Sequence, residues 1–274
     1  QRRTVSIKQI INSDLYPQRF LAVYDVTTYT VNMGVKYLVN ESFFDTWNNP
    51  MAYVLGYLYA DGSLEDAPYI RGKYVRVTST DRDRIETIRA LLKSEHSIVR
   101  KVQGVRRKPL FLLRIGNSKL FGALIEIGLT PRKSLIMTFP AVPLPYLGPF
   151  VRGYFDGDGC SRIDVVYGKP KRLLAIFTSG SRVFLEKLHK HLKSELGITG
   201  NGLYKHGSTA GTYQLRYSTR DSLRLFELMY PRGLERKLRL ERKYDIFRQY
   251  LKLRGLSESE IPMILNQKGP MVKR

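Results

Sequence analysis

Apolar and polar residues alternate in several short runs of the chain, which predicts strands that each have one apolar face. In Val75–Thr78 the valines point to one side, and the arginine and threonine point to the other. The run 213–217 alternates in the same way, and in 111–115 Arg114 points away from the apolar residues on either side of it. We therefore expect helices to cover the apolar face of a sheet, while the polar face stays open to a partner.

The predicted helices and strands occur in the same order twice. Asn49 is expected to cap the first helix and Pro50 to begin it, and Gly148-Pro149 begins the corresponding helix of the second half. Further helices are expected over 83–92, 119–127, 182–192 and 222–229, and strands over 73–78, 111–115, 173–178 and 213–217. Each half then has the order α-β-β-α-β-β-α. This order predicts an α+β fold of two repeats related by a pseudo-twofold axis, each with an antiparallel sheet.

The sequence repeats along with this pattern, which indicates an internal duplication. The segment Val54–Gly62 returns as Val151–Gly159, and Leu92–Glu95 returns as Leu192–Glu195. Two shorter matches further along each half keep the same order. We therefore divide the chain into an N-terminal extension, a first repeat, a proline-rich linker, a second repeat and a basic C-terminal tail, with the bounds 1–48, 49–139, 140–147, 148–254 and 255–274.

Small residues recur at helical spacing inside the two copies of the longest repeat. Gly56 and Ala60 share one face of the first helix, and Gly153 and Gly157 share one face of its counterpart. Glycine inside a helix costs about 1 kcal/mol relative to alanine. The presence of these glycines therefore favours close packing of the two helices against each other.

Each of these two helices is predicted to end at an aspartate. Asp61 precedes Gly62 and Asp158 precedes Gly159, so paired helices would bring two carboxylates together at the negative ends of the helix dipoles. A divalent cation with oxygen ligands, most simply Mg²⁺, would relieve the repulsion between them. Two acids at the centre of a basic surface are what metal-assisted phosphodiester hydrolysis requires.

Composition adds a strongly cationic surface to this picture. The 274 residues contain 46 Lys and Arg against 24 Asp and Glu, a formal net charge of +22, which favours nucleic acid as the partner. The single cysteine, Cys160, excludes an internal disulfide framework and a cysteine zinc cluster. Short apolar runs and the lack of a signal-peptide pattern predict an intracellular protein, in cytoplasm, nucleoid or organelle matrix, with no membrane partner.

The segments Val54–Gly62 and Val151–Gly159 resemble the two copies of the LAGLIDADG motif of homing endonucleases. They share its small residues, its apolar and aromatic positions and its terminal Asp-Gly. The resemblance covers about residues 49–250 and departs from the family pattern at Tyr59, whereas Asp156 keeps the acid of that position. It implies a single-chain meganuclease that cuts both strands of a long, nearly non-palindromic DNA target and leaves short 3′ overhangs.

The resemblance also implies a metal site. Asp61 and Asp158 would bind the catalytic divalent metals, together with the backbone carbonyls of Ala60 and Gly157. Mg²⁺ is the expected ion. Mn²⁺ or Ca²⁺ would substitute in the same site, and Ca²⁺ would not support cleavage.

Further roles follow from the same resemblance. Lys133 and Lys237, each preceded by an arginine, would hold or polarise the attacking water and the phosphate near one active centre. The polar residue that often follows the second strand in this family would be Ser79 in the first half and Ser179 in the second.

The polar sheet faces and one loop supply the candidate DNA contacts. Arginine, lysine and glutamine side chains read base edges and hold phosphates in the major groove. The sheet candidates are Arg71, Lys73, Arg76, Arg114, Arg162, Lys171, Gln214 and Arg216. The loop candidates, expected to contact phosphates, are Arg106, Arg107 and Lys108.

Two other functions would use the same scaffold. One is an RNA maturase that binds its host intron without cutting DNA, and the other is a transcription regulator, which would usually need a separate DNA-binding domain. The segment 1–48 looks too short and irregular for such a domain. Retention of both Asp61 and Asp158 favours an active endonuclease, and the presence of both motif copies in one chain predicts a monomer. The resemblance to the family implies an intron-encoded protein, and an intein origin stays open.

Overall fold

The computed structural model describes residues 37–68, 72–102, 104, 107–167, 169–200, 202–206 and 211–266, with the side chains of 166 and 169–171 left undescribed. All of the described residues belong to one compact unit, Tyr37–Arg274. Within them, none of the helices combines the length and the apolar character that crossing a lipid bilayer requires.

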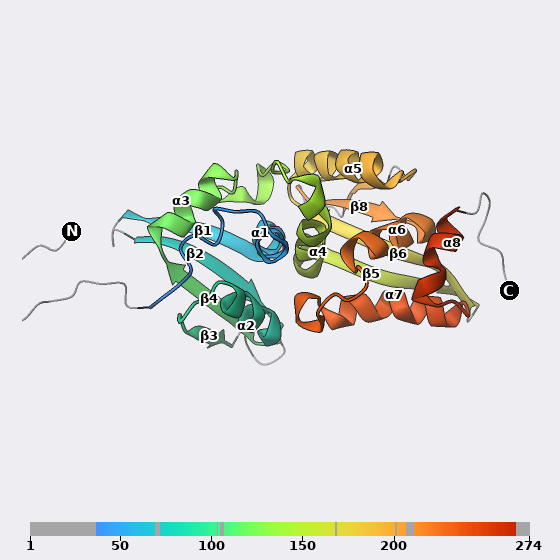
Figure 1. The fold of residues 1–274 in the computed structure, drawn as a ribbon, viewed down its shortest axis with the longest axis horizontal. Helices are drawn as coiled ribbons and strands as arrows, with labels where there is room; N and C mark the ends of the chain where they lie inside the picture. The colour runs from blue at the N-terminus through green and yellow to red at the C-terminus, as the bar shows by residue number, and fades with distance from the viewer. Residues whose placement is uncertain are drawn as a thin grey trace, which may run out of the picture. The chain divides into compact units, whose positions relative to one another are not determined.

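The first half alternates helices and strands around one sheet. In chain order its elements are α1 Asn49–Asp61, β1 Gly62–Ala67, β2 Gly72–Ser79, α2 Arg82–Leu91, β3 Ile98–Lys101, β4 Leu110–Gly116, α3 Ser118–Glu126 and the 3-10 turn η3 Lys133–Leu135. The strands form an antiparallel sheet in the order β1-β2-β4-β3. Helices α2 and α3 pack on it (Figure 1).

The second half repeats this arrangement and then continues. Its elements are η4 Leu144–Tyr146, α4 Leu147–Asp158, β5 Gly159–Val166, β6 Lys169–Ser179, α5 Arg182–Leu196, β7 Leu203–Lys205, β8 Tyr213–Tyr217, α6 Thr219–Met229, η5 Arg236–Leu238, α7 Glu241–Leu253, η6 Glu258–Glu260 and α8 Ile261–Asn266. The antiparallel sheet has the order β5-β6-β8-β7, which is the order of the first sheet. The predicted α+β fold of two repeated halves is confirmed.

Helix caps differ in detail from the expectation. The N-cap of α1 is Asn48, whose side chain accepts a hydrogen bond from the backbone N–H of Met51 at 2.9 Å, and Asn49 and Pro50 are the first two helical residues. Helix α4 begins at Leu147, inside the segment predicted as linker, because the preceding 3-10 turn runs directly into it.

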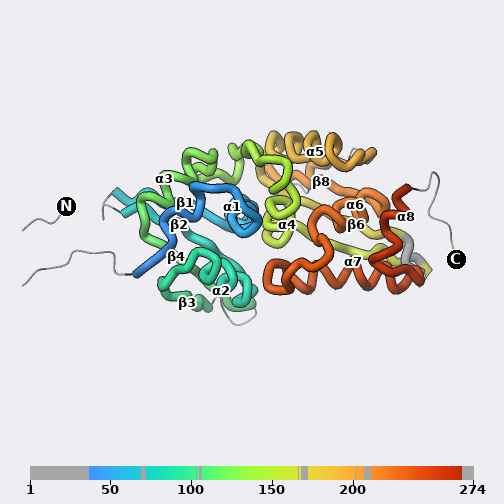
Figure 2. Tube along the Cα trace, in the orientation of Figure 1, coloured from blue at the N-terminus to red at the C-terminus, as the bar shows by residue number. Residues whose placement is uncertain are grey.

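Helices α1 and α4 lie side by side at the junction of the two halves (Figures 1 and 2). A Cβ added at Gly56 would overlap the carbonyl oxygen of Phe150, and one added at Gly153 would overlap the carbonyl oxygen of Tyr53. The two contacts are reciprocal, as a pseudo-twofold axis between the helices requires. The glycines therefore allow backbone-to-backbone packing, as their spacing predicted.

The residues that follow the predicted second repeat are more ordered than a loose basic tail. Ile261 and Ile264 are buried, and α8 packs against α6. Two glutamates in η6, rather than basic residues, flank this helix. The prediction of a tail from 255 onwards is therefore wrong for 258–266, because the apolar face of α8 needs a partner in the core; residues 267–274 lie outside the described residues.

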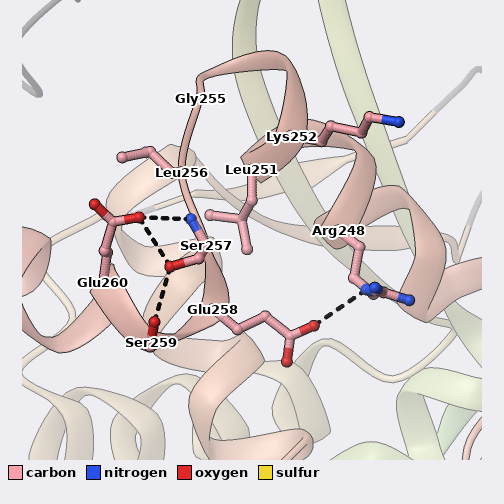
Figure 3. Close-up of a pocket in the computed structure, with 9 residues that line it drawn as sticks. All are labelled: Arg248, Leu251, Lys252, Gly255, Leu256, Ser257, Glu258, Ser259 and Glu260. Carbon is pink, nitrogen blue, oxygen red and sulfur yellow. Dashed lines mark hydrogen bonds and ion pairs between the residues drawn. The ribbon is translucent and has the colours of Figure 1, made fainter.

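An open hollow lies at the C-terminal end of α7 (Figure 3). Ser257 forms a capping box with Glu260, and Glu258 pairs with Arg248 at 3.2 Å. Its wall contains none of the aspartates or lysines considered below. This hollow is therefore a feature of the C-terminal packing and not of the candidate active site.

Candidate active site

Two aspartates end the paired helices at the same place. Asp61 is the last residue of α1 and Asp158 is the last residue of α4. A Cβ added at Gly157 would overlap that of Ala60 and would lie 3.3 Å from the Asp61 Oδ2 atom. Close packing of α1 and α4 therefore carries the carboxylate of one helix to the last turn of the other. The meeting of the two halves at this point was the geometric basis of the sequence prediction.

The electrostatics of the two carboxyl groups show that they share one site. Burial and the nearby charge of Asp158 raise the pKa of Asp61 to about 6, although Lys243 and Lys133 act in the opposite direction. Burial also raises the pKa of Asp158, again against Lys133 and Lys243. Charged carboxylates are thus held at a cost, at the ends of two helices whose dipoles disfavour them.

Two lysines reach the carbonyl oxygens at these helix ends. Lys133, in η3, donates from Nζ to the Ala60 carbonyl at 3.0 Å. Lys243, in α7, donates to the carbonyls of Phe155, Asp156 and Gly157 at 2.6, 2.8 and 3.0 Å. Each ammonium group therefore stands at the negative end of one motif helix, where it also faces the carboxylates.

The structure does not bring Lys237 to the aspartates. Its side chain is 63% exposed and pairs with Glu235 at 2.7 Å. The repeated Arg-Lys pair placed Lys237 opposite Lys133, but η5 turns it outward, and Lys243 from the following helix takes the place beside the carboxylates. The assignment of Lys237 is therefore corrected to Lys243.

The sequence contains a signal for Lys243 that the motif repeat does not provide, which is its position on an apolar helix face. It shares one face of α7 with Phe247, Tyr250 and Leu251, which are all buried. A lysine on an apolar helix face requires a buried partner, because leaving its charge unpaired would be costly.

Tyrosine and serine side chains complete each carboxylate environment. Tyr57 hydrogen-bonds to both Asp61 and Ser79, and the nearby charge of Asp61 adds to burial in raising the pKa of Tyr57. In the second half, the Tyr154 hydroxyl donates to the Thr178 carbonyl at 2.7 Å, and Tyr154 also contacts Ser179. Ser79 and Ser179 are buried next to the site, and each hydroxyl oxygen accepts a hydrogen bond from the backbone N–H two residues further along, that of Asp81 at 3.1 Å and that of Ser181 at 3.0 Å.

The donor set at the two helix ends matches a hard divalent cation. Two carboxylates and the carbonyl oxygens of Ala60 and Gly157 are all oxygen ligands, the type that Mg²⁺ and Ca²⁺ prefer. In the described part of the chain, no group of three or more His, Cys, Asp or Glu residues is placed to hold a metal. An ion between Asp61 and Asp158 would complete its coordination with carbonyls, water or phosphate oxygens.

The first sheet presents a preorganised cluster of charges on its open face. Arg114 donates to Glu65 through Nε at 3.2 Å and Nη2 at 3.1 Å, and its guanidinium lies 3.4 Å from the centroid of the Tyr74 ring. Arg76, directly opposite Arg114 in the sheet, lies 3.6 Å from Glu65. Glu65 holds the two positively charged arginines in place, and it was not among the residues predicted from the sequence.

The second sheet also has an acid paired with two arginines, at different positions. Asp164 pairs with Arg162 at 3.1 Å and with Arg172 at 3.0 Å. Arg216 donates to the side-chain oxygen of Gln214 at 2.9 and 2.7 Å. Arg172 and Asp164 were absent from the sequence prediction. The two faces therefore carry different sets of side chains.

Not every predicted DNA contact lies on an open face. Lys73 and Val75 point to the same side of the sheet, the side covered by α3, and the Nζ atom of Lys73 lies 4.8 Å from the centroid of the Phe121 ring. Lys73 therefore does not lie on the open face, because side chains alternate along a strand and Arg76 points to the open side. Arg107 and Lys108 are exposed, whereas Arg71, Arg106 and the side chain of Lys171 lie outside the described residues.

Asparagine at position 61 is expected to stabilise the metal-free protein at neutral pH. Because the folded-state pKa of Asp61 is raised, the unfolded chain ionises more readily, so stability falls as the pH rises from the ordinary pKa of 3.8 to about 6, and the full cost applies above that. We expect Asp61→Asn to raise the free energy of unfolding by ~1 kcal/mol at pH 7.5 in chelator, and by much less at pH 4. Urea unfolding at both pH values measures this, with Asp245→Asn as an exposed control. An equal gain at both pH values would contradict the expectation.

Comparisons with known proteins agree with the fold. Residues 146–229, from the end of η4 through α6, match the LAGLIDADG-like domain family. The structure of meganuclease I-SmaMI bound to uncleaved DNA in the presence of calcium ions is similar, with 14% identity, a TM-score of 0.51, and 79% of this chain and 94% of that chain covered. I-SmaMI bound to uncleaveable DNA with a TTCT central four gives 13%, 0.50, 79% and 96%.

A third structure, the LAGLIDADG meganuclease I-AabMI bound to uncleaved DNA, has 16% identity and a TM-score of 0.48, with 79% of this chain and 96% of that chain covered. No curated protein sequence matches the chain. Residues 146–229 thus match the LAGLIDADG-like domain family, and the chain has the homing endonuclease fold with two repeated halves.

Proposed function

We propose that this chain is a site-specific endonuclease that hydrolyses both strands of a DNA duplex with a divalent metal ion. The observation that carries the proposal is the meeting of Asp61 and Asp158 at the ends of α1 and α4, the packed helices that join two basic sheets. The similar I-SmaMI structure contains DNA and was obtained with calcium ions, which supports duplex DNA and a divalent ion as partners. Mg²⁺ is the proposed ion.

The residues of the chain divide the chemical work between them. Asp61 and Asp158, with the carbonyls of Ala60 and Gly157, would hold the metal, which supplies an activated water and neutralises charge on the leaving oxygen. Lys133 and Lys243 bring positive charge to the same place and would orient the scissile phosphates. Tyr57 holds the Asp61 carboxylate through its hydroxyl group.

The two open sheet faces support a long asymmetric target. Glu65, Arg76 and Arg114 on one face differ from Arg162, Asp164 and Arg216 on the other. Arginine held in a fixed orientation favours bidentate contacts with guanine, and phosphate contacts add affinity without sequence information. We propose a non-palindromic site cut to leave 3′ overhangs.

The cellular setting belongs to the proposal as well. Both carboxylates come from one polypeptide, so a monomer would suffice for double-strand cleavage. By resemblance to the family, we propose an intracellular, intron-encoded protein whose DNA target is the site of intron insertion.

Cleavage of a randomised duplex library in Mg²⁺ tests the proposed function. We expect double-stranded ends with 3′ overhangs to accumulate at one asymmetric sequence, and to disappear when the metal is chelated. Absence of any double-strand cut in Mg²⁺, Mn²⁺ or Co²⁺ would contradict the proposal. Binding to a structured intron RNA without cleavage would then favour the maturase.

Replacing each candidate lysine in turn tests whether Lys243 or Lys237 acts at the site. We expect Lys243→Met to slow cleavage about 100-fold, because it removes a charge placed beside the carboxylates. Lys237→Met should cut at the wild-type rate, since that exposed side chain pairs with Glu235 instead. Single-turnover rates measure both variants. A slow Lys237→Met with an unimpaired Lys243→Met would reverse the correction.

A further inference from the structure

A buried carboxylate that the proposed chemistry does not use lies two residues before Asp158. Asp156 in α4 is 2% exposed, and its Oδ2 atom accepts hydrogen bonds from the Tyr53 hydroxyl at 2.9 Å and from the Leu240 backbone N–H at 3.0 Å. Tyr53 belongs to α1, and Leu240 is the residue that precedes α7. One side chain therefore joins both motif helices to the start of a third helix.

Two buried arginines, one from each half, stand beside Tyr53, which donates to this carboxylate. Arg84 of α2 donates from Nη1 to the Tyr53 hydroxyl at 3.0 Å. Arg152 of α4, which is 1% exposed, lies 5.3 Å from the centroid of the Tyr53 ring and donates to the Met229 carbonyl at 2.7 Å. Tyr53 thus accepts a hydrogen bond from Arg84 and donates one to Asp156, and this buried chain of contacts holds both side chains in fixed positions.

The same carboxylate is linked to Lys243 through the start of α7. Asp156 fixes the residue before α7, and Lys243 stands three residues further along that helix. Lys243 is 4% exposed and donates to three consecutive carbonyls of α4, the middle one belonging to Asp156. Helix α7 is thus attached to the end of α4 at two points.

Within the ranges that the structure describes, the first half has no equivalent of this attachment. The residue of α1 that corresponds to Asp156 is Tyr59, whose hydroxyl finds no hydrogen-bond partner among the described residues. Lys133 lies in the short turn η3 and donates a hydrogen bond to the Ala60 carbonyl at this helix end. The two lysines are therefore held by different means, Lys243 by three carbonyls of α4 and Lys133 by the Ala60 carbonyl of α1.

We propose that Asp156 is a positioning residue that holds Lys243 at the end of α4, and that Tyr53 and Arg84 make this position depend on the first half. A change in this network would then slow cleavage at the centre that uses Lys243 and leave the centre that uses Lys133 unaffected. The proposal rests on the proposed nuclease function for its effect on cleavage, and on the geometry alone for its effect on Lys243.

Amine labelling of the metal-free, DNA-free protein tests the attachment without any cleavage. We expect the rate of Lys243 modification to rise about tenfold in Asp156→Asn, because a charge-assisted hydrogen bond and the buried negative charge are lost. Lys133 should keep its wild-type rate. Tyr53→Phe should give a smaller rise at Lys243 alone. Tyr217→Phe, which breaks a buried 2.8 Å contact with His189 in the second half, is the control for general destabilisation.

Strand-resolved cleavage then tests the consequence. Asp156→Asn should slow the same strand as Lys243→Met, leave nicked DNA, and add little to Lys243→Met in a double variant, because both changes remove one interaction. Equal slowing of both strands, or additive effects in the double variant, would overturn the positioning role. Unchanged labelling of Lys243 would overturn the attachment itself, and an inactive wild-type protein would refute the nuclease function while leaving the labelling result valid.

Discussion

Asp61→Asn and Asp158→Asn should each abolish double-strand cleavage while DNA binding stays within about twofold of wild type. Asparagine keeps the shape of the side chain but removes the anionic ligand, and the loss of several kcal/mol of charge stabilisation corresponds to a rate decrease of about 1,000-fold or more. Binding should survive because the proposed contacts to DNA come from the sheet faces. Single-turnover cleavage and filter binding at fixed salt measure the two quantities.

The stability of these variants separates a chemical role from a structural one. Because Asp61 carries a raised pKa in the folded protein, its replacement should not unfold the chain. Asp245→Asn, on the exposed side of α7, serves as the control for substitution of an acid. Wild-type cleavage of both strands by either active-site variant would contradict the metal assignment.

Gly153→Ala should destabilise the protein by ~3 kcal/mol or more, although alanine is the better helix former by about 1 kcal/mol. The added Cβ would overlap the Tyr53 carbonyl oxygen and lie 2.9 Å from the Tyr57 nitrogen, so the backbones of α1 and α4 would have to separate. Separation would also move the two aspartates apart, and cleavage should fall along with stability. Thermal unfolding and single-turnover cleavage measure both effects.

Gly122→Ala is the matched control for this substitution. Gly122 lies within α3, and a Cβ added there meets nothing within 4 Å. We expect a gain of about 0.5–1 kcal/mol from helix propensity alone, with unchanged cleavage. Equal effects of the two substitutions would show that α1 and α4 do not pack through their glycines.

Local pattern was enough to predict most of the fold. The alternation over 213–217 predicted β8 with the bounds that the structure has, because its apolar face is buried and its polar face is open. The reciprocal glycines predicted the packing of α1 against α4, since small residues at helical spacing have few other uses. Strand β7 was not predicted, because its three residues are too short for a period to appear.

The candidate site was less accessible to sequence reasoning where it depends on tertiary structure. Asp61 and Asp158 could be identified because the motif repeats. Lys243 could not, because the repeated Arg-Lys pair pointed to Lys237 and only the path of the chain through η5 and α7 decides between them. The network at Asp156 joins residues from α1, α2, α4 and the start of α7, and no local pattern relates their positions.

Anomalous diffraction from Mn²⁺ in crystals of the protein with a bound DNA duplex tests the central claim most directly. The account predicts anomalous peaks within about 2.5 Å of the carboxylate oxygens of Asp61 and Asp158, at the paired ends of α1 and α4. Peaks that lie elsewhere in a crystal whose protein cuts the same duplex, or carboxylates that lie apart with no ion between them, would contradict it.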